Sequence, residues 1–185
     1  MEYRIALNSL PPAGLSLTLD DPSVWAAPLR EFGLDCTVLS PLKADVFLQK
    51  QEGGCFVRGR LTGEISLPCD RCAEASQVTI DQPFETFEPV PSRSSSGAEP
   101  DADADENVMR LSENGPEINL AALLWEEFSL SLPVHPLCRS DCAGLCPVCG
   151  QNLNEKACAC TREQGDPKLA ALRGLTIKKS IPAAE

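Results

Sequence analysis

The sequence predicts an α+β fold, with an antiparallel β-sheet domain, a C-terminal helix and a cysteine-rich zinc-binding module, and three observations lead to this prediction. Residues 37–90 alternate apolar and polar side chains over stretches of strand length, with turn signals between them. An apolar stripe at helical spacing follows Asn119. Six of the ten cysteines lie between residues 138 and 160. At 185 residues, the chain has room for one ordinary domain and a small satellite.

The first half of the chain predicts the strands of the sheet. Residues 1–15 predict a short strand that includes Leu7 and ends at two prolines. Residues 21–33 predict a brief helical turn that is punctuated by Pro28. A tight reversal is expected at Gly53. Three longer strands are expected over residues 37–51, 55–68 and 77–90.

The second half predicts a helix followed by the cysteine-rich end. Asn119 can cap the helix, because its side-chain oxygen can accept a hydrogen bond from a backbone N–H of the first turn. The apolar face of this helix is formed by Leu120, Leu123, Leu124 and Phe128. Trp125 falls beside that face and is interpreted as a packing residue. Asp166 and Pro167 predict the start of a second, short helix.

These patterns divide the chain into four predicted regions. The stretch 91–106 has no core-forming residue and reads as a solvated connector. The regions are an antiparallel sheet domain with the Cys69/Cys72 turn (1–90), an acidic flexible connector (91–106), a strand and helix that pack on the sheet (107–137), and the zinc module with a basic C-terminal helix (138–185).

The formal net charge of −11 is distributed unevenly. Residues 81–127 hold twelve acidic side chains against two basic ones, whereas residues 128–185 hold five acidic and seven basic ones. This balance, together with the few aromatic residues, argues against strong nucleic-acid binding through phosphate contacts and base stacking. The basic side chains near the C-terminus are candidates for contact with RNA or an acidic protein, although such a tail is usually a solvated face. They are Lys168, Arg173, Lys178 and Lys179.

The cysteines are interpreted as metal ligands and not as disulfides. The N-terminus shows no basic start followed by an apolar run, so no secretory signal is visible. No apolar stretch approaches the roughly 18 residues that span a bilayer. We therefore expect a cytoplasmic protein without a membrane contact, in a reducing compartment where clustered thiols bind metal.

The spacing of the cysteines predicts a local zinc site and a second, long-range one. Cys146 and Cys149 flank a turn closed by Gly150, which is typical of a zinc knuckle. Four ligands complete a structural zinc site, and the six C-terminal cysteines exceed that number by two. The preferred local group is Cys146, Cys149, Cys158 and Cys160. The preferred long-range group is Cys69, Cys72, Cys138 and Cys142, so that one or two Zn²⁺ ions are expected per chain.

Other uses of these residues stay open at this point. Cys69 and Cys72 alone have the spacing of a redox dithiol, although no βαβ pattern surrounds them. An iron–sulfur cluster could use the same sulfurs. His135, the only histidine, could replace Cys138 as a ligand, but a surface or packing role is favoured. Cys36 and Cys55 have no partner spacing and are interpreted as small buried hydrophobes.

The sequence predicts no enzyme. It has one histidine and lacks a Ser/His/Asp arrangement, a G-x-G-x-x-G loop and a P-loop. A catalytic zinc site would have fewer thiolates and one open position. No small-molecule substrate and no catalytic residue are therefore expected.

Several stretches resemble the bacterial YceD family, also called large ribosomal RNA subunit accumulation proteins. The matching stretches are S-L-P-C-D-R-C at 66–72, I-N-L at 118–120, L-P-V at 132–134, C-R-S-D-C-A-G-L-C-P-V-C-G-Q-N-L-N at 138–154, C-A-C at 158–160 and D-P-K-L-A-A-L-R-G-L at 166–175. The resemblance covers nearly the whole chain except the acidic connector. It implies a non-catalytic accessory role in large-subunit biogenesis that supports 23S rRNA accumulation or processing.

The resemblance also implies a partner, which would be a large-subunit ribosomal protein or precursor 23S rRNA. It assigns no RNA-contact residue. Two alternative functions remain at this point: a thiol–disulfide oxidoreductase that uses Cys69 and Cys72, and a zinc-ribbon adaptor for another protein complex.

Overall fold

The computed structural model describes residues 3–91 and 107–160 and confirms an α+β fold built on antiparallel sheets. The elements are β1 (Arg4–Ala6), the 3-10 helix η1 (Leu7–Ser9), β2 (Leu15–Leu19), α1 (Ser23–Glu31), β3 (Thr37–Gln51), β4 (Gly54–Pro68), β5 (Ala75–Pro89), β6 (Met109–Ser112), β7 (Gly115–Asn119) and α2 (Leu120–Ser131). They form a four-stranded sheet in the order β2-β3-β4-β5 and a three-stranded sheet in the order β1-β7-β6. The chain divides into two compact units, Met1–Cys142 and Ala143–Glu185.

Three long strands, β3, β4 and β5, form most of the larger sheet, as the alternation predicted. The β4–β5 pair is in register over fifteen residues of each strand, from Gly54 opposite Pro89 to Pro68 opposite Ala75. Gly53 adopts a φ of +81° in the reversal between β3 and β4, a conformation that glycine adopts without steric cost. Along β4 the side chains alternate, because successive residues of a strand point to opposite faces. The predicted strands over 37–51 and 55–68 are confirmed within one residue.

The N-terminal strand is shorter than predicted. β1 ends at Ala6, and Leu7 begins the 3-10 helix, where its side chain is only 1% exposed. Burial of this leucine stabilises the fold at the early turn. Strand β2 was not predicted, although Leu15, Leu17 and Leu19 alternate as strand residues do. It pairs antiparallel with the C-terminal half of β3.

Helix α1 is longer than the brief turn that the sequence predicted. It runs over nine residues and contains Pro28, which was expected to interrupt it. Proline removes one backbone donor from a helix, at a cost of about 3 kcal/mol. Val24 and Trp25 are buried in the core, and the Trp25 and Phe128 rings pack with centroids 5.7 Å apart. This packing offsets the cost of the proline.

The helix predicted after Asn119 is confirmed. The Asn119 side chain accepts a hydrogen bond from the Ala122 N–H at 3.4 Å, as a capping residue does. The segment before α2 forms the β6–β7 hairpin, where the sequence had predicted one strand. An ion pair of 3.2 Å joins Arg110 to Glu117 across this hairpin.

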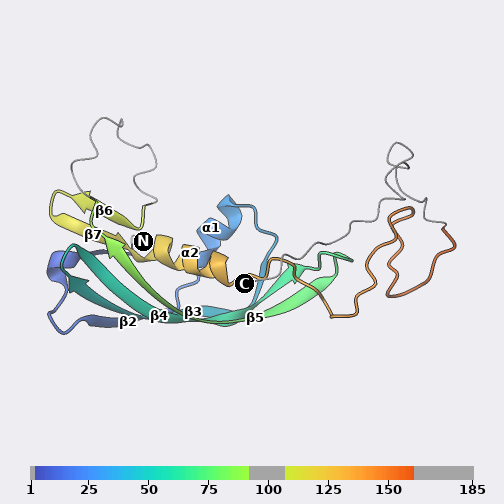
Figure 1. Ribbon diagram of the computed structural model, residues 1–185, viewed down its shortest axis with the longest axis horizontal. Helices are drawn as coiled ribbons and strands as arrows, with labels where there is room; N and C mark the ends of the chain where they lie inside the picture. The colour runs from blue at the N-terminus through green and yellow to red at the C-terminus, as the bar shows by residue number, and fades with distance from the viewer. Residues whose placement is uncertain (1–2, 92–106, 161–185) are drawn as a thin grey trace, which may run out of the picture. The chain divides into compact units, whose positions relative to one another are not determined.

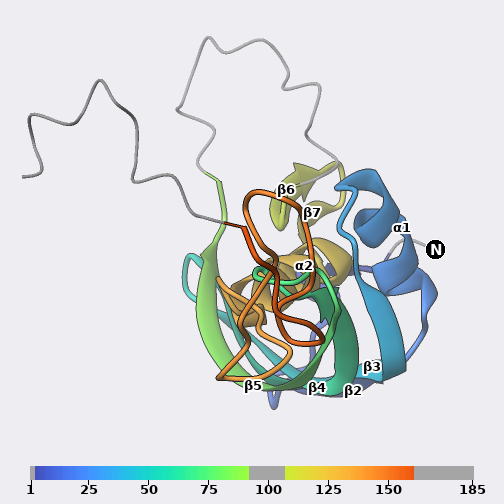
Figure 2. The same cartoon turned by 90° about the vertical axis from the view of Figure 1, so that its right-hand side faces the viewer.

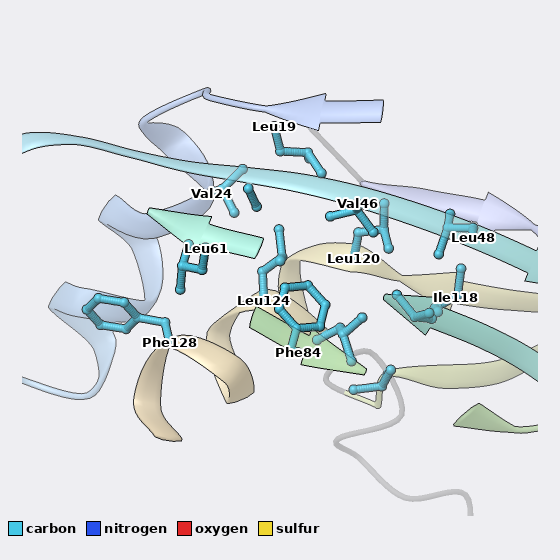
Figure 3. Packing of buried hydrophobic residues seen from close by; sticks show 14 of the residues in the cluster. Leu19, Val24, Val46, Leu48, Leu61, Phe84, Ile118, Leu120, Leu124 and Phe128 are labelled. Atoms are coloured by element: carbon cyan, nitrogen blue, oxygen red, sulfur yellow. The ribbon is translucent and has the colours of Figure 1, made fainter. Parts of the chain in front are cut away.

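The larger sheet is curved, and α1, α2 and the smaller sheet lie on its concave side (Figure 1). Figure 2 shows the sheet curling around α2. The hydrophobic core fills the space between them, and Figure 3 shows Leu61 of β4 and Leu124 and Phe128 of α2 among its side chains. Burying each such side chain stabilises the fold by roughly 1.5–3 kcal/mol. The four leucine and phenylalanine residues predicted for the inner face of α2 are buried in this core: Leu120, Leu123, Leu124 and Phe128.

Among the described residues, no helix has the length and apolar character needed to cross a membrane. Residues 92–106 of the predicted acidic connector lie outside the described residues. The predicted helix that starts at Asp166 also lies outside them, as do the four basic candidates Lys168, Arg173, Lys178 and Lys179.

Candidate metal centres

The first group of four thiols joins two distant parts of the unit Met1–Cys142. Cys69 and Cys72 lie in the turn between β4 and β5, at one end of the long hairpin (Figure 1). The chain that follows α2 brings Cys138 and Cys142 to the same place. The Cys69 and Cys142 sulfurs are 3.9 Å apart, the Cys72 and Cys138 sulfurs are 3.6 Å apart, and all four lie within 4.8 Å of one another.

Two backbone hydrogen bonds close the β4–β5 turn that carries Cys69 and Cys72. The Cys69 N–H donates to the Glu74 carbonyl, and the Ala73 N–H donates to the Cys69 carbonyl, both at 2.8 Å. Ala73 closes the turn with a φ of +60°, which a non-glycine residue rarely adopts. The turn is therefore held in a strained conformation that places the two cysteines side by side.

Three further contacts hold the chain after α2 against this turn. The Asp70 N–H donates to the Pro136 carbonyl at 2.9 Å. His135 Nδ1 lies 2.8 Å from the Asp70 carboxylate, and Arg71 Nη1 donates to the Cys142 carbonyl at 2.8 Å. His135 is an exposed residue that pairs with Asp70, and its ring is not among the four converging groups. The two residues between Cys69 and Cys72 thus bind the segment that carries the other two thiols.

The second group of four thiols is local to the unit Ala143–Glu185. Cys146, Cys149, Cys158 and Cys160 have sulfurs within 4.8 Å of one another. The Cys146 N–H donates to the Gln151 carbonyl, and the Gly150 N–H donates to the Cys146 carbonyl, both at 2.8 Å. Gly150 has a φ of +73°. The expected role of this glycine in closing the turn is confirmed.

The backbone around each turn stabilises one thiolate. A backbone hydrogen bond from Cys138 is the largest influence on Cys69, and it lowers the pKa of that thiol to about 6. Backbone hydrogen bonds from Cys149 and Val148 lower the pKa of Cys146 to about 6 in the same way. Hydrogen bonds to the charged form of an acid favour that form. Each group therefore contains one sulfur that is prepared to be a thiolate at neutral pH.

In each group, at least one other thiol resists ionisation. Although Cys138 as a whole is exposed, partial desolvation of its sulfur, followed by the neighbouring thiols, raises its pKa to about 12. Hydrogen bonding with Cys149 and burial raise the pKa of Cys160 to about 12. Four negative charges cannot share one small space without a cation between them. A divalent ion would remove this repulsion and deprotonate the thiols outright.

The donor set and its dimensions fit one zinc ion in each group. Zinc binds four thiolates tetrahedrally with bonds of about 2.3 Å, which puts the sulfurs about 3.8 Å apart. The sulfur separations of 3.6 and 3.9 Å in the first group lie on either side of that value. All ten cysteines are free thiols, and the two groups contain eight of them. Cys55 is buried as expected, whereas Cys36 is only half-buried because it lies in the loop before β3.

Residues 57–176 match the family described as Large ribosomal RNA subunit accumulation protein YceD, and this stretch is well over half of the chain. The chain belongs to the YceD family. All eight cysteines of the two groups lie inside the matched stretch, and so does the segment from β5 to α2. Both candidate metal centres are therefore part of the region that defines YceD membership.

Similar curated proteins include bacterial and plant chains. An uncharacterised protein of Mycobacterium leprae is 29% identical over 154 residues, which are 80% of this chain and 64% of that protein. The large ribosomal RNA subunit accumulation protein YCED homolog 1, chloroplastic, of Arabidopsis thaliana is 26% identical over 156 residues, or 74% of this chain and 49% of its own length. An uncharacterised protein of Mycobacterium tuberculosis is 28% identical over 180 residues, which are 84% of this chain and 79% of that protein. This YceD chain thus spans less than two thirds of the length of the first two relatives, and no solved structure matches it.

The equivalence of the two cysteine turns was not predicted from the YceD sequence. Cys69-Asp-Arg-Cys72 and Cys146-Pro-Val-Cys149 share no residue between their cysteines. The available signal was the small residue after each pair, Ala73 in one case and Gly150 in the other. Spacing alone could find the cysteine pairs, but the matching backbone hydrogen bonds are visible only in the fold.

Proposed function

We propose that this YceD protein is a non-catalytic accessory factor in large ribosomal subunit biogenesis that supports 23S rRNA accumulation or processing. The observation that carries the proposal is the family match over residues 57–176. The name of the Arabidopsis relative, a large ribosomal RNA subunit accumulation protein, supports the same role. The proposed partner is a large-subunit ribosomal protein or precursor 23S rRNA, met in the cytoplasm.

We further propose that each group of four thiols binds one structural Zn²⁺ ion. The sulfur-only donor sets and their mutual distances of at most 4.8 Å support this assignment. A four-thiolate site has no open position for water or substrate, which supports a structural and not a catalytic use of the metal. The long-range centre would fasten the β4–β5 turn to the chain after α2, and the local centre would hold residues 146–160 together.

Depletion of the protein in its own host tests the proposed role. We expect the level of large-subunit rRNA and the amount of free and assembled large subunits to fall, while small-subunit rRNA is unchanged. Wild-type protein should restore both, and the Cys69→Ser/Cys72→Ser variant should not. Unchanged large-subunit rRNA and an unchanged subunit profile after depletion would contradict the proposal.

Elemental analysis of the purified full chain tests the metal assignment. We expect two zinc ions per chain in the wild type and one in each variant that lacks a ligand of one centre. Iron in place of zinc, or no bound metal, would contradict the assignment. The protein should be purified under reducing conditions, because oxidation of the thiols would prevent metal binding.

A thiol–disulfide oxidoreductase that uses Cys69 and Cys72 is the second candidate, because the pKa of Cys69 is lowered to about 6. Zinc and redox use of these sulfurs are separated by alkylation of the metal-loaded protein. Bound zinc should protect both cysteines from iodoacetamide and from disulfide formation. Rapid alkylation of Cys69 in protein that retains two zinc ions would support the redox function.

A further inference from the structure

A groove of about 580 Å³ lies between α1 and α2. Small side chains of both helices line it and let another chain approach closely, among them Ala27, Ala121 and Ala122. Trp125 and Phe32 form one wall, and their rings are stacked with centroids 5.3 Å apart and an angle of 11° between the planes. The groove is thus a hydrophobic cleft with an aromatic side.

The aromatic wall is open to solvent. Phe32 is 61% exposed although one face of its ring lies against Trp125. Leu130 continues the exposed surface along α2, because it follows Glu126 by four residues and lies on the same side of the helix. Exposed apolar side chains that adjoin a cleft indicate a site for another molecule more than a solvated surface.

The groove carries negative charge that nothing in the described part of the chain neutralises. Glu31 and Glu126 line it, and no basic side chain does. Burial and the nearby Glu88 raise the pKa of Glu126, and burial, Glu126 and Glu88 raise that of Glu127. No ion pair among the described residues involves these four glutamates. The cleft is therefore complementary to a cation, and it repels phosphate.

The convex face of the larger sheet differs in this respect. Several of its cations already have partners, because Arg60 contacts Asp81 and Lys43 lies 3.2 Å from Asp45. Arg58 lies over the Phe47 ring at 4.9 Å from its centroid. A face whose cations already have partners within the chain offers little to a phosphate backbone. The α1–α2 groove combines carboxylates that have no ion pair among the described residues with an open aromatic ring.

We propose that the groove between α1 and α2 docks a segment of a basic protein that carries arginine or lysine beside an apolar side chain. This inference rests on the proposed function and deepens it, because it assigns the direct contact to a protein and not to RNA. A guanidinium can stack on the open face of Phe32 while it pairs with Glu126 or Glu31. The aliphatic stem of a lysine and a neighbouring apolar residue would fill the cleft between the helices.

Fluorescence anisotropy with the full-length protein tests this site. The probe is a labelled amphipathic peptide with leucine on one face and arginine on the other. We expect the Glu31→Gln/Glu126→Gln variant to bind it about tenfold more weakly, because both carboxylates that can pair with the peptide's arginines are lost. The Phe32→Ser variant, which changes an exposed side chain, should also weaken binding. Raising the salt concentration should reduce the difference between the wild type and the double variant.

Matched controls separate this site from general attraction to an acidic protein. Glu85→Gln removes one negative charge from the exposed convex face and should leave peptide binding unchanged. The same peptide with glutamate in place of arginine should not bind. Equal weakening by Glu85→Gln and Glu126→Gln, tighter binding of a single-stranded RNA than of the peptide, or dimerisation that the Phe32→Ser variant abolishes would each overturn the inference.

The groove and the proposed function can fail separately. If the double variant binds the peptide normally while depletion still lowers large-subunit rRNA, the groove assignment is wrong and the function stands. If peptide binding depends on the groove while depletion leaves the rRNA unchanged, the groove binds a basic protein in another process. Circular dichroism and zinc content of the variants should match the wild type, so that any loss of binding is local.

Discussion

The two cysteine turns of this protein share a backbone geometry but differ in what completes them. In each turn the first cysteine N–H donates five residues ahead, and the N–H four residues ahead donates back to its carbonyl, at 2.8 Å in all four cases. Ala73 and Gly150 close the turns with φ values of +60° and +73°. The first turn is completed by thiols 66 and 73 residues away, whereas the second is completed within fifteen residues of Cys146.

This difference assigns the two centres different structural roles. The long-range centre lies in a unit that also has a hydrophobic core, a continuous fifteen-residue hairpin pairing and the Asp70 and Arg71 contacts. The local unit has one isolated bridge, between Leu145 and Asn152, in its described part. A small unit with few contacts depends on its metal for folding. In a unit that has its own hydrophobic core, a metal would only cross-link two segments that the core already holds in place.

Metal removal should reveal this contrast most strongly. We expect a chelator at neutral pH to remove hydrogen-exchange protection from residues 143–160 while the four-stranded sheet stays protected. Binding of structural zinc contributes about 10–16 kcal/mol to the folding of small metal-dependent units. Exchange measured by mass spectrometry with and without chelator checks this. Simultaneous loss of protection in both units would show that they do not fold separately.

Single ligand substitutions should separate the two roles next. Cys138→Ser opens the loop between Cys72 and Cys138, and we expect it to lower the free energy of unfolding of the sheet unit by about 4 kcal/mol, by analogy with a covalent closure of that length. Cys149→Ser should leave that free energy unchanged. Both substituted cysteines are exposed, so neither change opens a cavity. Urea unfolding followed by the fluorescence of core Trp25 measures the effect, and an equal loss in both variants would contradict it.

The ionisation of the metal-free protein provides a third contrast. Cys69 should react with iodoacetamide with a midpoint near pH 6, because its unit stays folded and its backbone hydrogen bonds persist. Cys146 has the same lowered pKa in the folded state, but it should return to about 8.5 when its unit unfolds. Mass spectrometry of each alkylated peptide against pH checks this. Equal midpoints near pH 6 would mean that the local unit folds without metal.

The same shifts predict how the stability of the metal-free sheet unit depends on pH. The lowered pKa of Cys69 means that its thiolate stabilises the fold, and this contribution grows as pH rises from about 6 to about 8.5. The pKa of Cys138 is raised to about 12, so its neutral form is favoured in the fold, and this contribution is lost as pH rises above about 8.5. We therefore expect the stability of this unit to be greatest near pH 8.5. The urea midpoints of unfolding at pH 6, at pH 8.5 and above pH 9 measure this dependence.

The smallest expected contrast lies at the residue that closes each turn. Ala73→Gly should be neutral or stabilising, by up to about 1 kcal/mol, because it relieves a left-handed alanine. Gly150→Ala should destabilise the local unit by about 1 kcal/mol. The cost comes only from the left-handed backbone conformation, because no atom lies within 4 Å of the added Cβ. Zinc affinity of the local centre, measured by competition with a chromophoric chelator, should fall accordingly. A tighter site in Gly150→Ala would contradict this explanation.

Sequence reasoning predicted the features that depend on local pattern. Alternation located β3, β4 and β5, and Asn119 marked the start of α2. Counting the cysteines grouped the same eight sulfurs that the fold brings together. Each of these signals lies within a few residues of the feature that it predicts, and a tetrahedral site requires four ligands whatever the fold.

Other features could not be predicted because the residues that interact to form them lie far apart in the sequence. β1 is a three-residue strand that pairs with β7, with Arg4 opposite Asn119, and no local pattern specifies that pairing. Pro28 was expected to interrupt a helix, but the burial of Trp25 against α2 outweighs it. Trp125 was correctly interpreted as a packing residue, yet its position in the wall of the groove depends on Phe32 of another segment.

Local sequence patterns were therefore sufficient to predict the long strands, the capped helix, the cysteine groups and the resemblance to the YceD family. The elements that cover the sheet, the strained closure at Ala73 and the acidic groove between α1 and α2 became visible only in the folded chain. The physical reason is that hydrogen-bonding periodicity and ligand number act over short stretches. Packing of the two helices depends on the free energy of burying side chains that are more than ninety residues apart, such as Trp25 and Phe128.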